Sequence, residues 1–144
     1  MDKSINHARA WRLAVALTGL YAAVWLALEG APIRDLLLAA ALLALALWRV
    51  LSRRLLERVN GGAWRGARRV GLSAAAGLAF GAGLPLLTLF LMALKTGLHA
   101  HGPEYSAAQI AWVWGQLPLW AGAGLLAGVG VGLVGAGLRR SAKT

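Results

Sequence analysis

The positive charges of this chain are concentrated in three short segments that are separated by apolar runs. Thirteen of the fifteen lysines and arginines lie before the first apolar run, between the second and third, or after the fourth. The two intervening loops carry only Arg34 and Lys95. Positively charged loops stay on the cytoplasmic side when a membrane protein inserts. The pattern therefore predicts an all-α membrane protein with four transmembrane helices and both termini in the cytoplasm.

The length and composition agree with this fold class. A chain of 144 residues that is 59% hydrophobic and 14% charged is unlike an ordinary soluble domain. A bilayer core of ~30 Å needs about 20 helical residues per crossing. We expect a single domain, residues 1–144, in a bacterial-type cytoplasmic (inner) membrane, with the first apolar run retained as a span rather than removed as a signal peptide. The predicted spans are residues 11–28, 36–51, 70–94 and 107–138.

The net charge of +10 is explained by contact with lipid. The basic residues flank apolar spans instead of forming one solvated face, which favours anionic lipids as partners over nucleic acid. The helix of the second span is expected to continue into the cytoplasm as a basic extension. The cytoplasmic basic cluster consists of Arg49, Arg53, Arg54, Arg58, Arg65, Arg68 and Arg69.

Small residues at four-residue spacing mark the third and fourth spans as the helices that pack most closely. Such faces allow two helix backbones to approach each other. The two predicted packing faces are Ser73, Gly77 and Gly81, and Gly124, Gly128 and Gly132. They serve either contact within the chain or contact with a membrane-protein partner or a second copy. Pro85 and Pro118 predict helix kinks, because proline removes a backbone donor. The second span contains no glycine, and we expect much of its surface to face lipid.

The predicted spans contain few groups that could carry chemistry. Asp35 is expected to cap the second span and Trp25 to mark a membrane interface, so no ionisable group falls at depth. The chain has no cysteine. Hydroxyl groups in the spans are expected to bond to backbone carbonyls. Gln116 is expected to bond the carbonyls that Pro118 leaves free, with a substrate or interhelical role as the alternative. We therefore predict no enzyme activity and no cofactor.

Reactive side chains are concentrated in the loop between the third and fourth spans. This outer-loop polar cluster consists of Lys95, His99, His101, Glu104 and Tyr105. Lys95 is expected to extend outward to the interface, and Ser106 and Gln109 match a capping box that opens the fourth span. His99, His101 and Glu104 could together offer three ligands to Zn²⁺ or Cu²⁺. The favoured interpretation is a polar turn in which the histidines form hydrogen bonds and no metal is bound.

Two functions from different classes remain open on the sequence. The first is a small non-enzymatic accessory, assembly or interaction subunit that packs through its glycine-rich third and fourth spans. The alternative is an oligomeric transporter or pore for a small solute, because interrupted helices can form binding sites in transporters. A histidine metal site in the outer loop is a further alternative.

Overall fold

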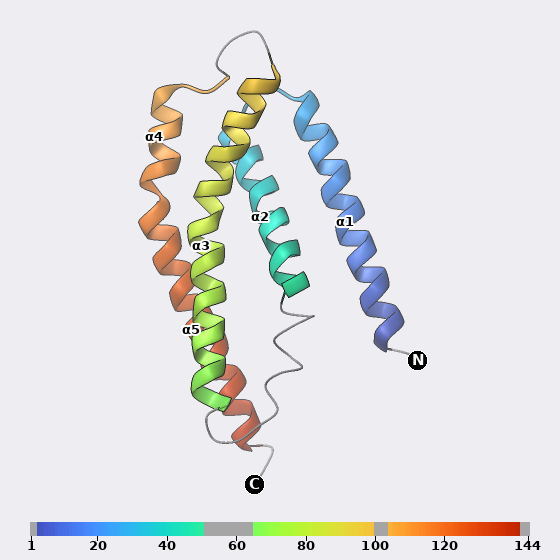
Figure 1. Ribbon diagram of the computed structural model, residues 1–144, viewed down its shortest axis with the longest axis vertical. Coiled ribbons are helices and arrows are strands. Elements are labelled where there is room, and N and C mark those ends of the chain that lie inside the picture. Colours follow the sequence, from blue (N-terminus) through green and yellow to red (C-terminus); the bar gives the residue numbers. More distant parts are fainter. Residues whose placement is uncertain (1–2, 51–64, 100–103, 142–144) are drawn as a thin grey trace.

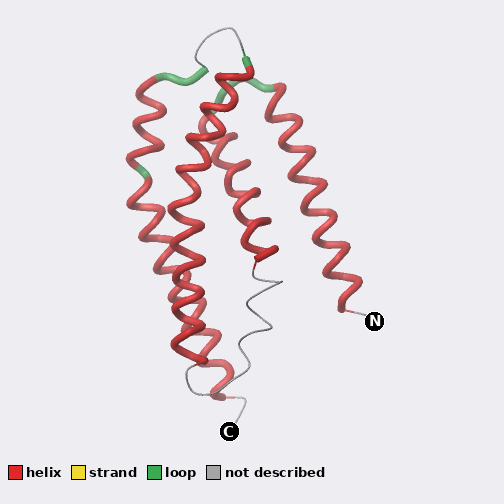
Figure 2. The backbone as a smooth tube through the Cα atoms, viewed as in Figure 1, coloured by secondary structure: helices red, strands yellow, loops and turns green. Residues whose placement is uncertain are grey.

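The computed structural model describes residues 3–50, 65–99 and 104–141, and these residues form five helices. The helices are α1 (Lys3–Ala27), α2 (Pro32–Val50), α3 (Arg65–Leu98), α4 (Ala107–Gly115) and α5 (Leu117–Ser141). The helices α1, α2 and α3 run in alternating directions, and α4 and α5 follow each other in one direction as the last leg of the bundle (Figure 1). The described parts of the chain contain helices and loops and no strand (Figure 2).

Three helical stretches in the described residues are long and apolar enough to cross a membrane. They are His7–Ala27, Gly66–Leu98 and Ala107–Gly137. The helix α2 does not reach this length of uncharged sequence, because Arg34, Asp35 and Arg49 lie near its ends. Its uncharged part, residues 36–48, covers roughly 20 Å at 1.5 Å per residue, against the ~30 Å of a bilayer core. The predicted extension of this helix, with Arg53, Arg54 and Arg58, lies outside the described residues.

The first turn of α2 begins earlier than the sequence indicated. The helix begins at Pro32, and the backbone N–H groups of Arg34 and Asp35 donate to the carbonyl of Ala31 at 2.9 and 3.3 Å. Proline is favoured at the first helical position because its missing N–H would have no partner there. The prediction that Asp35 caps this helix is therefore wrong. Asp35 lies inside the first turn, and its carboxylate is available to another helix.

The helices α3 and α5 are packed backbone to backbone through their glycines. A Cβ atom added at Gly77 would lie 3.0 Å from the Cα of Gly128, and one added at Gly124 would lie 3.0 Å from the Cα of Gly81. One added at Gly132 would lie 2.7 Å from the Cα of Val70. Side chains larger than hydrogen do not fit at such distances. The structure thus places both glycine faces against each other, in a contact within the chain.

One half of the bundle, where α1 joins α2 and α3 leads into α4, holds the larger apolar core, and we name it the outer half after the predicted outer loop. Its buried members are Trp25, Leu38, Ala39, Leu84 and Leu91, from α1, α2 and α3. In this half, α2 buries Leu38 and Ala39, whereas Ile33 and Leu37 are 60% and 54% exposed. One side of α2 therefore packs in the core, and the expectation that much of its remaining surface faces lipid stays a prediction.

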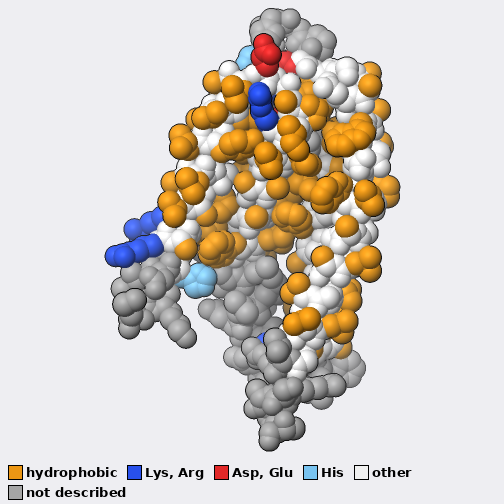
Figure 3. Space-filling view, turned by 180° about the vertical axis from the view of Figure 1, so that it is seen from behind, with side chains coloured by type: hydrophobic (Ala, Val, Ile, Leu, Met, Phe, Trp, Pro, Cys, Tyr) orange, Lys and Arg blue, Asp and Glu red, His pale blue; other side chains and the backbone are white. Residues whose placement is uncertain are grey.

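The helix α1 contributes little to the core along its length. Only 6% of its most apolar stretch is buried inside the protein, against 33% of the corresponding stretch in α3. Near its first residues, the ring of Trp11 lies 6.2 Å from that of Trp48 on α2, and the Arg49 guanidinium lies 5.5 Å from the centre of the Trp11 ring. Apolar side chains cover most of the described surface on the face that Figure 3 shows.

Candidate functional site: a buried polar cluster and a neighbouring cavity

Polar side chains from three helices and one loop meet at the outer end of the bundle. Trp25 belongs to the last turns of α1, and Asp35 to the first turn of α2. Lys95 lies in the last turn of α3, and the segment before α4 adds two more residues. We call this group the outer-end cluster, and its members are Trp25, Asp35, Lys95, His99, Glu104 and Tyr105.

Lys95 is the central cation of the outer-end cluster and is fully buried. Its Nζ donates to the carbonyl oxygen of Trp25 at 2.9 Å and lies 5.0 Å from the centre of the Trp25 ring. The same nitrogen is 4.0 Å from Oε2 of Glu104. The prediction that Lys95 extends outward is therefore wrong. Because α3 continues to Leu98, Lys95 lies within the helix and faces α1, where a carbonyl, a ring and a carboxylate stabilise its charge.

Asp35 is the second fully buried charged residue. The indole Nε1 of Trp25 donates to Oδ1 of Asp35 at 2.6 Å. Trp25 is itself buried, so it does not mark an exposed interface as predicted. The burial of Asp35 and Lys95 differs from the prediction, which places both residues at span ends and no ionisable group at depth. The structure shows that both are inside the protein.

His99 connects α3 to the segment before α4. Its Nδ1 lies 2.9 Å from Oε1 of Glu104 and 3.1 Å from the carbonyl oxygen of Lys95. Both neighbours are hydrogen-bond acceptors, so Nδ1 carries the proton. His101 lies outside the described residues. Within the described ranges, no group of three histidine or carboxylate side chains is close enough to hold a metal ion.

Tyr105 is buried beside the two carboxylates. Burial raises the pKa of its phenol well above the usual range, and the nearby negative charges of Asp35 and Glu104 raise it further. In the described part of the chain, Tyr105 Oη, Asp35 Oδ2 and Glu104 Oε2 each lack a hydrogen-bond partner.

Gly30, in the loop between α1 and α2, makes room for this arrangement. A Cβ atom added there would lie 2.8 Å from Oε2 of Glu104 and 2.9 Å from Cζ of Tyr105. A larger residue would displace both side chains. Nothing in the local sequence around Gly30 indicates that the segment before α4 lies against it.

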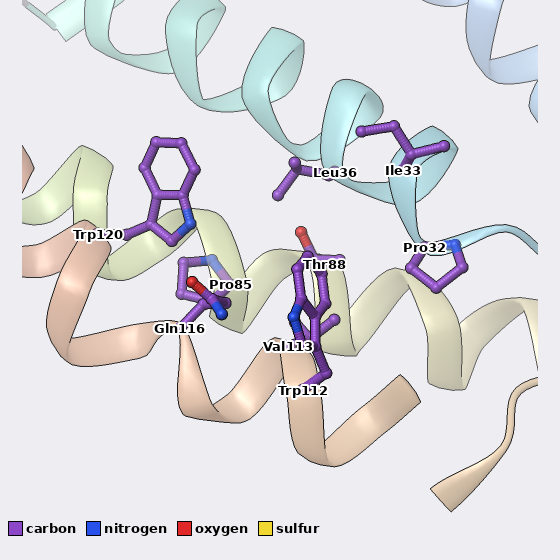
Figure 4. A pocket seen from close by; sticks show the side chains of 9 residues that line it. All are labelled: Pro32, Ile33, Leu36, Pro85, Thr88, Trp112, Val113, Gln116 and Trp120. Atoms are coloured by element: carbon purple, nitrogen blue, oxygen red, sulfur yellow. The ribbon is translucent and has the colours of Figure 1, made fainter. Parts of the chain in front are cut away.

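A cavity of about 140 Å³ lies below the cluster, between α2, α3 and the junction of α4 with α5 (Figure 4). The predicted fourth span is interrupted here, because α4 ends at Gly115 and α5 begins at Leu117. The interruption falls two residues before Pro118, where a kink was predicted. Pro85, the other predicted kink, lies inside α3, which continues through it, and its ring forms part of the cavity wall.

Gln116 does not have the role that the sequence suggested. Its backbone carbonyl accepts from the N–H of Trp120 at 3.0 Å. Its side-chain amide forms no hydrogen bond with a backbone carbonyl of the described residues. The side chain extends from the α4–α5 junction toward Pro85 and lines the cavity (Figure 4).

Other local predictions are confirmed. Ser106 and Gln109 form the expected capping box, with bonds of 2.8 and 3.2 Å. The hydroxyls of Thr18, Ser73 and Thr88 each donate to the carbonyl four residues earlier, at 2.8, 2.9 and 2.8 Å. Short polar side chains in these apolar helices are therefore satisfied by their own backbone.

Comparison with known proteins adds no assignment. A scan of protein-family models, a search of curated proteins and a search of solved structures each gave no match to this chain.

Proposed function

We propose that this protein is a small non-enzymatic subunit of the bacterial-type inner membrane, with four spans and both termini in the cytoplasm. In this arrangement α2 is the second of four crossings, in addition to the three longer apolar stretches. The basic segments would lie on the cytoplasmic side with anionic lipids, and the outer-end cluster would face the other side of the membrane.

A structural role is supported most directly by the burial of the ionisable groups in the outer-end cluster and by their contacts. Lys95 and Asp35 are fully buried, and the Glu104 side chain is 7% exposed. Their contacts are with one another, with Trp25 and with His99, so they fasten the two outer loops together. A catalytic group must instead reach its substrate.

The surface that would meet a partner follows from the packing. The glycine faces of α3 and α5 are occupied by each other, whereas α1 is an apolar helix with little of its surface buried. Its exposed side chains include Leu13, Leu17 and Leu20. We therefore assign the partner contact to α1 and not to the glycine-rich spans.

The topology can be tested with single cysteines, since the chain has none of its own. Cysteines at Ser4 and Ser141 should resist an impermeant thiol reagent in intact cells, and one at Ser106 should react. Labelling at Ser4 from outside would overturn the assignment.

The interaction role can be tested by the mass of the complex after extraction into native nanodiscs. The wild-type chain should be recovered with a second membrane protein, and Leu17→Trp should release that protein while the chain itself remains folded. Leu126→Trp is the matched control, because Leu126 is 72% exposed on α5, and it should retain the partner. Recovery of the wild-type chain alone, or equal loss in both variants, would contradict the proposal.

A transporter or pore is the second candidate, and the interrupted helix at Gln116 favours it. Breaks in transmembrane helices expose backbone and side-chain groups to a bound solute. Four helices cannot enclose a path, so this function requires several copies. A homo-oligomer in native mass spectrometry, with solute flux in proteoliposomes, would support it over the interaction role.

A further inference from the structure

The cavity between α2, α3 and the α4–α5 junction has a closed floor and an open side. Pro85 and Val113 form part of its inner wall and are buried. Ile33 and Trp112, which are 60% and 59% exposed, form its rim. Because Ile33 lies on α2 and Trp112 on α4, we place the opening at the side of the bundle between these two helices.

The position of the cavity places its opening in the apolar zone. Gln116 is nine residues beyond the first residue of α4, or roughly 14 Å along the helix axis. It lies within the apolar stretch Ala107–Gly137. A molecule that entered from the side would therefore come from the hydrocarbon of the bilayer.

The size of the cavity limits its occupant to a small molecule. Its volume of about 140 Å³ is close to the 150 Å³ of an apolar cavity that is known to bind benzene. One six-membered ring with a small substituent fills such a space. The indole rings of Trp112 and Trp120 provide aromatic walls for it.

The Gln116 amide determines the chemistry of the occupant. A primary amide has two donors and one acceptor, and none of the described residues bonds to it. A lipid acyl chain in the cavity would leave these groups unpaired in an apolar environment, which is costly. A hydroxyl group both accepts from an amide N–H and donates to an amide oxygen.

We propose that this cavity is a binding site for a bilayer-dissolved, single-ring molecule that carries a hydroxyl group, a phenol in its simplest form. The ring contacts Pro85, Val113 and the two indoles, and the hydroxyl bonds to the amide of Gln116. This site rests on the proposed membrane-spanning arrangement, but it requires neither the partner contact on α1 nor an oligomer, so it can be tested apart from both.

The test compares 4-fluorophenol with 4-fluorotoluene, which replaces the hydroxyl with a methyl group of similar size. Each probe is titrated into the full-length protein in nanodiscs and followed by fluorine NMR. Empty nanodiscs of the same composition correct for partitioning into lipid. One hydrogen bond predicts that 4-fluorophenol binds about fivefold to tenfold more tightly.

Three variants assign the effect to the site. Gln116→Leu keeps the apolar volume and should abolish the preference for the phenol while ring binding persists. Val113→Phe places a ring in the cavity and should abolish binding of both probes. Leu119→Met is the matched control, because Leu119 is exposed beside the junction and does not line the cavity, and it should bind as wild type does.

The opposite results would overturn the proposal. Equal affinity for both probes would show a generic apolar crevice that acyl chains fill. A preference that survives Gln116→Leu would place the hydroxyl elsewhere. Absence of binding to the wild-type protein above the empty-nanodisc level would exclude the site.

Discussion

The indole N–H of Trp25 donates to the carboxylate of Asp35 over 2.6 Å, and this bond joins the end of α1 to the start of α2. The carbonyl of the same tryptophan accepts from Lys95 at 2.9 Å, so one residue contacts both buried charges. The helix α1 has few other buried contacts. Trp25 therefore attaches α1 to the outer half of the bundle, together with Tyr21, whose hydroxyl donates to the carbonyl of Arg34 at 3.2 Å.

Trp25→Phe should destabilise the fold by about 2 kcal/mol, because it leaves a buried carboxylate without its donor. The free energy of unfolding in mixed micelles measures the effect. Trp114→Phe is the control, since Trp114 is 58% exposed, and its cost should stay within about 0.5 kcal/mol. Equal costs for the two variants would mean that the Trp25–Asp35 bond contributes nothing.

Lys95→Met should be more damaging than the loss of that single bond. It removes the only buried cation among the described residues and leaves Asp35 and Glu104 as uncompensated negative charges. Breaking a buried ion pair from one side costs about 3–5 kcal/mol. Unfolding in mixed micelles should show a loss in this range.

The double variant Lys95→Met with Glu104→Gln separates charge from packing. Neutralising Glu104 should recover part of the stability that Lys95→Met loses, which a double-mutant cycle would report as coupling. Strict additivity of the two substitutions would contradict a direct interaction between Lys95 and Glu104.

The glycine contact between α3 and α5 can be tested with the smallest possible substitution. A Cβ at Gly128 would lie 3.0 Å from the Cα of Ala74 on α3, whereas one at Gly130 meets nothing within 4 Å. Gly128→Ala should cost about 1–3 kcal/mol through overpacking. Gly130→Ala should be neutral or stabilising by up to about 1 kcal/mol, because alanine favours the helix. Similar effects at both positions would contradict the backbone contact.

The sequence predicted features that depend on local spacing. The capping box at Ser106 and Gln109 and the helix break near Pro118 are set by residues within one turn of each other. The glycine faces of α3 and α5 also follow from spacing, because a repeat of four residues defines one side of a helix. Which surface they contact could not be predicted, since the same stripe suits a neighbouring span or a partner.

The outer-end cluster could not be predicted, because its contacts join residues far apart in the chain. Lys95 donates to the carbonyl of Trp25, 70 residues away. A lysine near a helix end can extend into solvent or pair with a buried carboxylate. Lys95 is buried because α3 continues to Leu98, which turns its side chain toward α1. The position of Gln116 could not be predicted for the same reason. Its polarity indicated a need for a hydrogen-bond partner, but the cavity that it faces is lined by residues of α2, α3, α4 and α5.

Tyr105 makes the stability of the protein sensitive to alkaline pH. Its pKa is raised in the folded state by burial and by Asp35, whereas a phenol in the unfolded chain titrates near pH 10. The neutral phenol therefore stabilises the fold below about pH 10, and this contribution is lost as the pH rises through the folded-state value. Thermal unfolding should show a decrease in stability above about pH 10 that is smaller in Tyr105→Phe.

Tyr21→Phe is the control, because it removes the only other tyrosine, and it should retain the decrease. In that variant the ultraviolet phenolate signal should appear only above the pH range of a free phenol. A phenolate signal centred near pH 10 in Tyr21→Phe would show that Tyr105 is accessible to water and would remove this explanation.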